Sequence, residues 1–195
     1  MRLAAPLVLA STSIYRRQLL ERLGIPFEVA SPATDETPLP NETPEALVRR
    51  LAEAKARSVA GRHPGAVVIA SDQVAVIDGQ IIGKPGSAEK NAEQLRLASN
   101  RAVTFYNGLA LRSPVEPCLQ LELVLFRVHF RPLSESTIQR YIERDRAFDC
   151  AGGFKSEQLG IALFSSMEGE DPTALMGLPL IALTGMLDRI GMPVV

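Results

Sequence analysis

The strongest constraint on the fold is the apolar run Leu7–Ala10, which passes directly into a hydroxyl-rich turn and then an amphipathic segment. The run has the length of a short strand, and three leucines follow within residues 19–23 at the spacing of one buried helix face. Ser11 or Thr12 is placed to cap that helix. A strand that feeds a helix through a tight polar turn is typical of α/β proteins.

The same turn has the composition of a phosphate-binding site. The N-terminus of a helix attracts anions, because its unpaired N–H groups and its dipole both present positive charge. Arg16 and Arg17 add bidentate donors suited to phosphate, and Ser11 adds a hydroxyl. An ordinary capped helix with two solvated arginines would show the same pattern, so other segments must decide between the two interpretations.

The bulk composition narrows the class of protein. The 195 residues predict a single domain over residues 1–195, or two lobes around a cleft. The net charge of −1 argues against binding to long nucleic-acid polymers, which need a broad basic field. No segment has the roughly 20 apolar residues of a membrane helix, and the first residues do not resemble a signal peptide.

The cysteines and histidines predict neither a disulfide framework nor a zinc site. Cys118 and Cys150 lack a paired spacing, and His63 and His129 do not form a ligand pair. This usage fits the reducing cytoplasm. The sequence leaves the oligomeric state open, with a homodimer as one arrangement.

Periodicity and turn signals predict an alternation of strands and helices. Strands are expected over Leu7–Ala10, Phe27–Ala30, Ala66–Ala70 resuming at Val74–Ile77, Val103–Leu111, Leu119–Phe130 and Ile161–Phe164, with a hairpin turn at Asp78-Gly79 and a return arm through Ile82. Helices are expected after the first strand and over residues 43–61, 87–99, 134–144 and 178–190. This order predicts an α/β fold with a mixed, twisted sheet flanked by helices, in two lobes around a substrate cleft.

Asp72 stands out because it interrupts the most apolar predicted strand. A carboxylate at the end of a buried run is costly unless it is paired, hydrated or bound to a cation. Strand ends are also where α/β sheets bind ligands. A metal or water ligand and a structural cap for a neighbouring turn both fit this position.

Three other polar positions are ordinary when taken one at a time. Lys55 lies at the edge of a helical apolar stripe, Lys84 follows the hairpin arm, and Glu36 belongs to a loop rich in proline and hydroxyls. Together with Asp72 and the arginines they form a set of several cations and a few carboxylates. Such a set is what a triphosphate and a divalent metal require.

At this point the sequence resembles the Maf family of nucleoside triphosphate pyrophosphatases. The matching segments run in order along nearly the whole chain: residues 9–13 with 16–17, 35–37, 54–56, 71–73, 83–85, 104–108, 150–160 and 177–180. The resemblance implies hydrolysis between the α- and β-phosphates of a nucleotide, which gives a nucleoside monophosphate and pyrophosphate with the help of a divalent metal.

The resemblance also implies a role for each candidate residue. Asp72 would be the general base or a ligand of the metal that activates water, and Glu36 would complete the metal site. Oxygen ligands favour Mg²⁺ or Mn²⁺. The phosphates would be held by Ser11, Arg16, Arg17, Lys55 and Lys84.

Three positions are similar to the branch of the family that acts on 7-methyl-GTP and so removes a modified nucleotide. The dTTP/UTP branch typically carries Arg, Thr and Gln where this chain has Tyr15, Gln73 and Glu157. Tyr15 can stack on the cationic methylated base, a contribution on the order of 0.5–2 kcal/mol. Glu157 can accept from the N1–H and N2–H groups of guanine, which pyrimidines lack.

The chain departs from this branch at Ile14, where proline is usual, and at Tyr15, where tryptophan is expected. Two alternatives therefore stand beside 7-methyl-GTP hydrolysis. One is a dTTP/UTP pyrophosphatase of the same family, and the other is a non-enzymatic nucleotide-binding regulator of cell division.

Overall fold

The structure, a computed structural model, describes residues 5–115 and 118–195. The strands are β1 (Leu7–Ala10), β2 (Glu28–Ala30), β3 (Val67–Ile77), β4 (Gln80–Ile82), β5 (Ala102–Arg112), β6 (Leu119–Phe130) and β7 (Phe164–Glu168). The α-helices are α1 (Ile14–Glu21), α2 (Pro44–Ala60), α3 (Ala88–Ala98), α4 (Glu135–Asp145) and α5 (Leu180–Arg189). Three 3₁₀ turns complete the chain: η1 (Ala151–Gly153), η2 (Leu159–Leu163) and η3 (Pro172–Met176).

All seven strands join one mixed sheet. Its order is β2-β1-β3-β5-β6-β7, and β4 pairs with the far end of β3. The first three strands of this path are parallel and the remaining pairs are antiparallel. The α/β class and the mixed sheet predicted from the sequence are confirmed.

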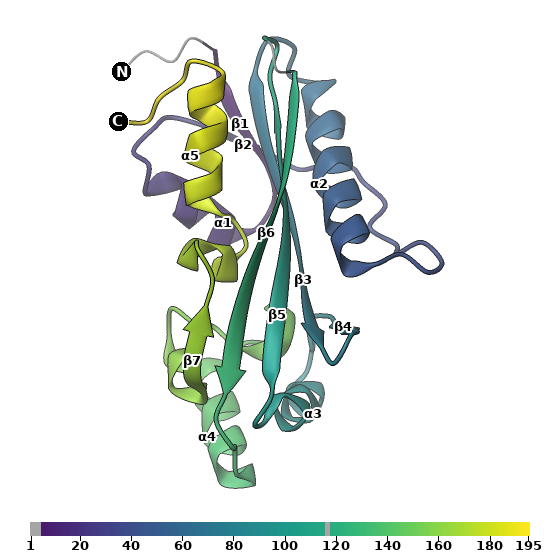
Figure 1. Cartoon of the computed structure of the whole chain (residues 1–195), viewed down its shortest axis with the longest axis vertical. Helices are drawn as coiled ribbons and strands as arrows, with labels where there is room; N and C mark the ends of the chain where they lie inside the picture. The colour runs from purple at the N-terminus through teal and green to yellow at the C-terminus, as the bar shows by residue number, and fades with distance from the viewer. Residues whose placement is uncertain (1–4, 116–117) are drawn as a thin grey trace.

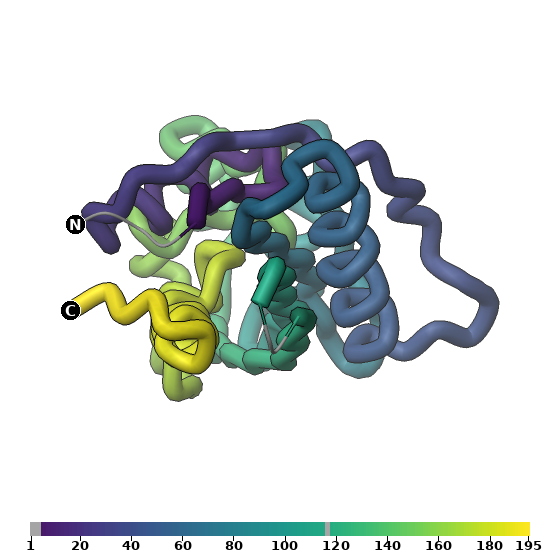
Figure 2. The backbone as a smooth tube through the Cα atoms, turned by 90° about the horizontal axis from the view of Figure 1, so that it is seen from above, coloured from purple at the N-terminus to yellow at the C-terminus, as the bar shows by residue number. Residues whose placement is uncertain are grey.

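The long strands connect two groups of helices. In Figure 1, α1, α2 and α5 surround one end of β5 and β6, while α3 and α4 lie at the other end. Seen from above, α2 and α5 cover opposite sides of the sheet, and the segment between β2 and α2 loops away from the body of the molecule before returning to α2 (Figure 2). That segment carries Glu36.

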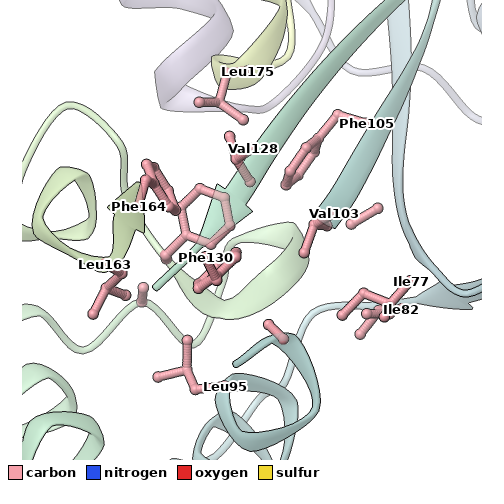
Figure 3. Packing of buried hydrophobic residues seen from close by; sticks show 14 of the residues in the cluster. Ile77, Ile82, Leu95, Val103, Phe105, Val128, Phe130, Leu163, Phe164 and Leu175 are labelled. Atoms are coloured by element: carbon pink, nitrogen blue, oxygen red, sulfur yellow. The ribbon is translucent and has the colours of Figure 1, made fainter. Parts of the chain in front are cut away.

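The core at the α3/α4 end is built on aromatic rings. Phe154 lies edge-on to Phe105, Phe130 and Phe164, with ring centroids 4.8–5.5 Å apart. Figure 3 shows Phe130 and Phe164 among the aliphatic side chains of this cluster. Edge-to-face packing is the favourable geometry for such rings. It fixes the segment around η1, which contributes to the cavity described below.

The structure corrects three local predictions. The polar residues at 71–73 do not interrupt β3, because Asp72 pairs in register with Gly108 of β5 and the ladder continues on both sides. Helix α1 is capped by Ser13, whose Oγ accepts from the N–H of Arg16, and not by Ser11 or Thr12. Residues 159–163 form η2, and the last strand begins only at Phe164.

The third correction has a steric reason. A Cβ at Gly160 would lie 2.4 Å from the carbonyl oxygen of Lys155, to which the Gly160 N–H donates. This close approach folds the chain into a tight turn where the apolar sequence alone suggested a strand.

In the described residues, no helix is long and apolar enough to span a membrane.

Candidate active site

A cavity of about 430 Å³ opens beside the N-terminus of α1. Its walls come from α1, α2, β3, the β2–α2 segment, the loop after β4 and the segments around η1 and η3. The structure brings together almost all the predicted site residues on this wall: Ser11, Tyr15, Arg16, Glu36, Lys55, Asp72, Gln73, Lys84 and Glu157.

Arg17 is the exception. Its Nε donates to Glu21 Oε1 at 2.9 Å, one turn along α1, and its side chain is largely exposed. Successive residues on a helix point about 100° apart, so Arg16 and Arg17 cannot both face the same cavity. The structure therefore does not bring Arg17 to this cavity wall with the other predicted site residues.

Lys55 links the two predicted metal ligands. Its Nζ lies 2.6 Å from Asp72 Oδ1 and 2.9 Å from Glu36 Oε1. The Lys55 and Asp72 side chains are only 6% and 8% exposed, whereas Glu36 is open to solvent. Burial of the Asp72 carboxylate thus depends on the ammonium group beside it. Because both carboxylates contact the same nitrogen, they converge on one side of the cavity.

A second ion pair holds the segment that carries Glu36. Arg50 makes a bidentate contact with Glu42, with Nε–Oε1 at 2.6 Å and Nη2–Oε2 at 2.7 Å, and it also donates to the carbonyl oxygen of Thr37. The hydrogen bonds from Arg50 lower the pKa of Glu42 to about 2. Through these contacts with Thr37 and Glu42, Arg50 holds the β2–α2 segment against α2.

Arg16 reaches across to the C-terminal part of the chain. Its Nε donates to the carbonyl oxygen of Gly177 at 2.9 Å, which leaves the two terminal nitrogens for a ligand. Burial lowers the pKa of Arg16, while the charges of Asp72 and Glu36 oppose that shift. Gly177 has a φ of 96°, and a Cβ there would lie 3.3 Å from Arg16 Nε. Glycine therefore permits both the turn and the close approach.

Gln73 is held by the same region. Its Nε2 donates to Asn107 Oδ1 at 3.1 Å and to the carbonyl oxygens of Ala174 and Leu175 in η3. With its amide hydrogens used inside the protein, Gln73 offers a ligand only its Oε1 acceptor. The turn itself is fastened by the buried Asp171, which accepts from the N–H groups of Thr173 and Ile181.

Asp149, which no pattern in the sequence marks, also lines the cavity. Tyr15 donates from its hydroxyl to Asp149 Oδ2 at 3.1 Å, across 134 positions of sequence. Burial is the largest of several causes that raise the pKa of Tyr15, and burial also raises the pKa of the neighbouring Cys150 thiol to about 11. Both groups therefore keep their protons at neutral pH. No local spacing signal could have paired Asp149 with Tyr15.

The donor set fits a hard divalent cation. Glu36 Oε2 and Asp72 Oδ2 accept no hydrogen bond from the described parts of the chain, and the positive charge of Arg16 lies close enough to act on both carboxylates. Residues 5–115 and 118–195 contain no group of three or more His, Cys, Asp and Glu side chains that could hold a metal ion. Two carboxylates can still bind Mg²⁺ or Mn²⁺ when substrate phosphates and water supply the other ligands.

Comparison with known proteins gives a family and two similar sequences. The profile of the family described as Maf-like protein matches residues 6–190. A protein named 7-methyl-GTP pyrophosphatase from Pseudomonas aeruginosa is 54% identical over 188 residues, which cover 96% of this chain and 98% of that protein. A protein of the same name from Nitrosococcus oceani is 53% identical and covers 96% of this chain and 94% of its own.

Solved structures are more distant. The Ham1 protein of Staphylococcus aureus aligns with a TM-score of 0.49 and 17% identity over 80% of this chain and 89% of that one. A nucleoside-triphosphatase, or dITP/XTP pyrophosphatase, from Mycobacterium abscessus aligns with a TM-score of 0.41 and 18% identity over 66% and 75%. Likeness at this level carries no conclusion about the site.

Proposed function

Because this chain belongs to the Maf family, we propose that it is a nucleoside triphosphate pyrophosphatase that hydrolyses 7-methyl-GTP to 7-methyl-GMP and pyrophosphate. The observation that carries the proposal is that a single cavity holds two sets of side chains. One set is cationic and includes two carboxylates next to a lysine, and the other is the Tyr15 ring with the carboxylates of Asp149 and Glu157. The names of the two relatives with more than half of their residues identical support the choice of substrate.

The phosphates bind on the cationic wall. Arg16 offers its two terminal nitrogens, and Lys84 adds an exposed ammonium group at the cavity edge. Ser11 lies in the turn between β1 and α1, beside a helix N-terminus whose backbone N–H groups attract anions. These groups neutralise the triphosphate and stabilise the charge that moves onto the leaving pyrophosphate.

Asp72 acts as the general base. Lys55 occupies Oδ1 and fixes the carboxylate, while Oδ2 remains available to accept a proton from the attacking water. Attack at phosphorus breaks the bond to the oxygen that bridges the α- and β-phosphates, and pyrophosphate leaves. Most of the rate enhancement then comes from positioning and from charge stabilisation, as is usual in phosphoryl transfer.

A divalent cation completes this site in our proposal. Glu36 would hold the ion, and Asp72 would join it as a ligand only if the ion, rather than the carboxylate, activates the water. When bound, the ion neutralises phosphate charge and lowers the pKa of coordinated water. The release of Lys55 from Glu36, which is exposed and on a loop, would make room for the ion without disturbing the buried pair with Asp72.

The base lies against Tyr15 and Glu157. Tyr15 is half-buried in the cavity wall, and a ring face suits the delocalised positive charge of 7-methylguanine. Glu157 is exposed and, among the described residues, accepts only a 3.4 Å contact from Ser156 Oγ, so its oxygens are available to the N1–H and N2–H groups of the base. We place this activity in the cytoplasm, where nucleoside triphosphates are made and used.

A pyrophosphate-release screen over canonical and modified triphosphates tests the proposal. The purified protein is assayed with 7-methyl-GTP, GTP, dTTP and UTP in the presence of Mg²⁺, Mn²⁺ or excess chelator, and products are separated by chromatography. We expect 7-methyl-GMP and pyrophosphate from 7-methyl-GTP, at the highest kcat/KM, and only with added metal. A higher kcat/KM for dTTP or UTP would overturn the substrate assignment, and full activity with chelator would overturn the role of metal.

A further inference from the structure

The hydroxyl of Tyr15 and the carboxylate of Asp149 form a contact that the phosphate chemistry does not use. The two oxygens lie 3.1 Å apart, and both residues line the cavity. The phenol O–H is the donor and the carboxylate oxygen the acceptor. A phenol that donates to a full negative charge makes a stronger hydrogen bond than one that donates to a neutral acceptor.

Hydrogen bonds hold the Asp149 carboxylate in place. Within the described residues its oxygens accept from Tyr15 and, at 3.6 Å, from the Cys150 thiol, and it forms no ion pair. Glu157, on the same cavity wall, also lacks a cationic partner in the part of the chain that the structure describes. Asp149 therefore keeps its carboxylate oxygens for the hydrogen bond from Tyr15.

The backbone around Asp149 is fixed rather than free. The N–H of Gly86 donates to the carbonyl oxygen of Phe148 at 2.9 Å, and the Phe148 N–H donates to Arg146. On the other side, η1 packs under the ring of Phe154. These contacts hold the carboxylate at a defined place, from which it can set the orientation of the Tyr15 ring.

We propose that Asp149 is a positioning residue for Tyr15 and thereby a determinant of the preference for a cationic base. This inference rests on the proposed function. The hydrogen bond fixes the plane of the ring and draws the phenol proton toward the carboxylate, which makes the ring face more electron-rich. A cationic 7-methylguanine gains from both effects, whereas a neutral guanine gains mainly from stacking.

The test compares four variants. Asp149→Ala removes the acceptor, Asp149→Asn keeps an acceptor without charge, and Tyr15→Phe removes the donor but keeps the ring. The fourth combines Asp149→Ala with Tyr15→Phe. Asp188→Asn is the matched control, since Asp188 is an exposed carboxylate on α5 outside the cavity wall. For each protein, kcat/KM is measured for 7-methyl-GTP and GTP, and calorimetry gives Kd for the products 7-methyl-GMP and GMP.

We expect Asp149→Ala and Tyr15→Phe each to lower the methylated-to-unmethylated ratio about three- to tenfold, in both kcat/KM and affinity. The ratio of Asp149→Asn should lie between those of Asp149→Ala and the wild type. The methylated-to-unmethylated ratio of the double variant should lie within twofold of the ratios of Asp149→Ala and Tyr15→Phe, because the same hydrogen bond is lost in all three proteins. The Asp188→Asn control should keep the wild-type ratio.

Three results would overturn the inference. The wild type could prefer the methylated base while Asp149→Ala keeps a methylated-to-unmethylated ratio within twofold of the wild-type ratio. That result refutes the role of Asp149 and leaves the proposed function standing. An Asp149→Ala effect that is just as large in the Tyr15→Phe background shows that the carboxylate acts directly on the base, not through Tyr15. A wild type that binds 7-methyl-GMP no better than GMP refutes the base assignment itself, and this inference with it.

Discussion

Replacement of Lys55 by methionine should destabilise the protein far more than the loss of an ordinary surface cation. Methionine has nearly the length of lysine and fills the same space, but it leaves the Asp72 carboxylate without the ammonium group 2.6 Å away. Both side chains are more than nine-tenths buried. Removal of one partner from a buried ion pair costs about 3–5 kcal/mol, since the remaining charge is neither solvated nor paired.

Urea unfolding at pH 7 measures this loss. The chain has no tryptophan, so circular dichroism is the suitable probe. We expect the free energy of unfolding of Lys55→Met to fall by about 3–5 kcal/mol, and Asp72→Asn in the same chain to restore most of it, because the orphaned charge is then gone. Arg17→Met is the matched control: its pair with Glu21 is largely exposed and should be worth at most about 1 kcal/mol.

Two unfolding results would contradict the role given to the ion pair of Lys55 and Asp72. If Lys55→Met lowers the free energy of unfolding no more than the Arg17→Met control does, Lys55 is not what compensates the buried carboxylate of Asp72. If Asp72→Asn adds a further loss to Lys55→Met instead of relieving it, the cost arises from packing around residue 55 and not from an unpaired carboxylate.

Three further changes test the binding walls of the cavity. Gly177→Ala should raise KM for the triphosphate roughly tenfold, because the strained φ of 96° and the new Cβ both displace Arg16; a KM within twofold of the wild type would contradict this. Arg16→Ala and Lys84→Ala should weaken triphosphate binding much more than binding of the bare nucleoside, and equal losses in a titration of both ligands would show that neither side chain contacts phosphate. Glu157→Gln should reduce the preference for 7-methyl-GTP over UTP by roughly tenfold or more, since an amide replaces one acceptor with a donor; unchanged selectivity would exclude the pairing with N1–H and N2–H.

The sequence was sufficient for the order of elements because apolar spacing and turn residues are local signals. The helix starts near Thr43 and Ser87 and the turn at Asp78-Gly79 are all observed where the sequence predicted them. The prediction was wrong at residues 71–73, where polarity suggested a break. Pairing of Asp72 with Gly108 preserves the ladder, and the partner strand lies 36 positions away.

The composition of the site was also largely predictable, but its internal contacts were not. The resemblance to a family identifies residues such as Lys55 and Asp72 without showing that one neutralises the other. The choice between Arg16 and Arg17 depends on which side of α1 faces the cavity, and the two arginines look alike in the sequence. Asp149 could not be found in advance, because its partner Tyr15 belongs to the opposite part of the chain.

In the proposed mechanism, the buried carboxylate of Asp72 performs the chemistry on a triphosphate bound in this cavity. The most direct test is pyrophosphate release from 7-methyl-GTP by Asp72→Asn, measured beside its unfolding curve and its affinity for 7-methyl-GMP. We expect a folded protein that still binds the product but has lost turnover by at least about a hundredfold, because the general base is absent. Near-normal pyrophosphate release by the folded variant would contradict it.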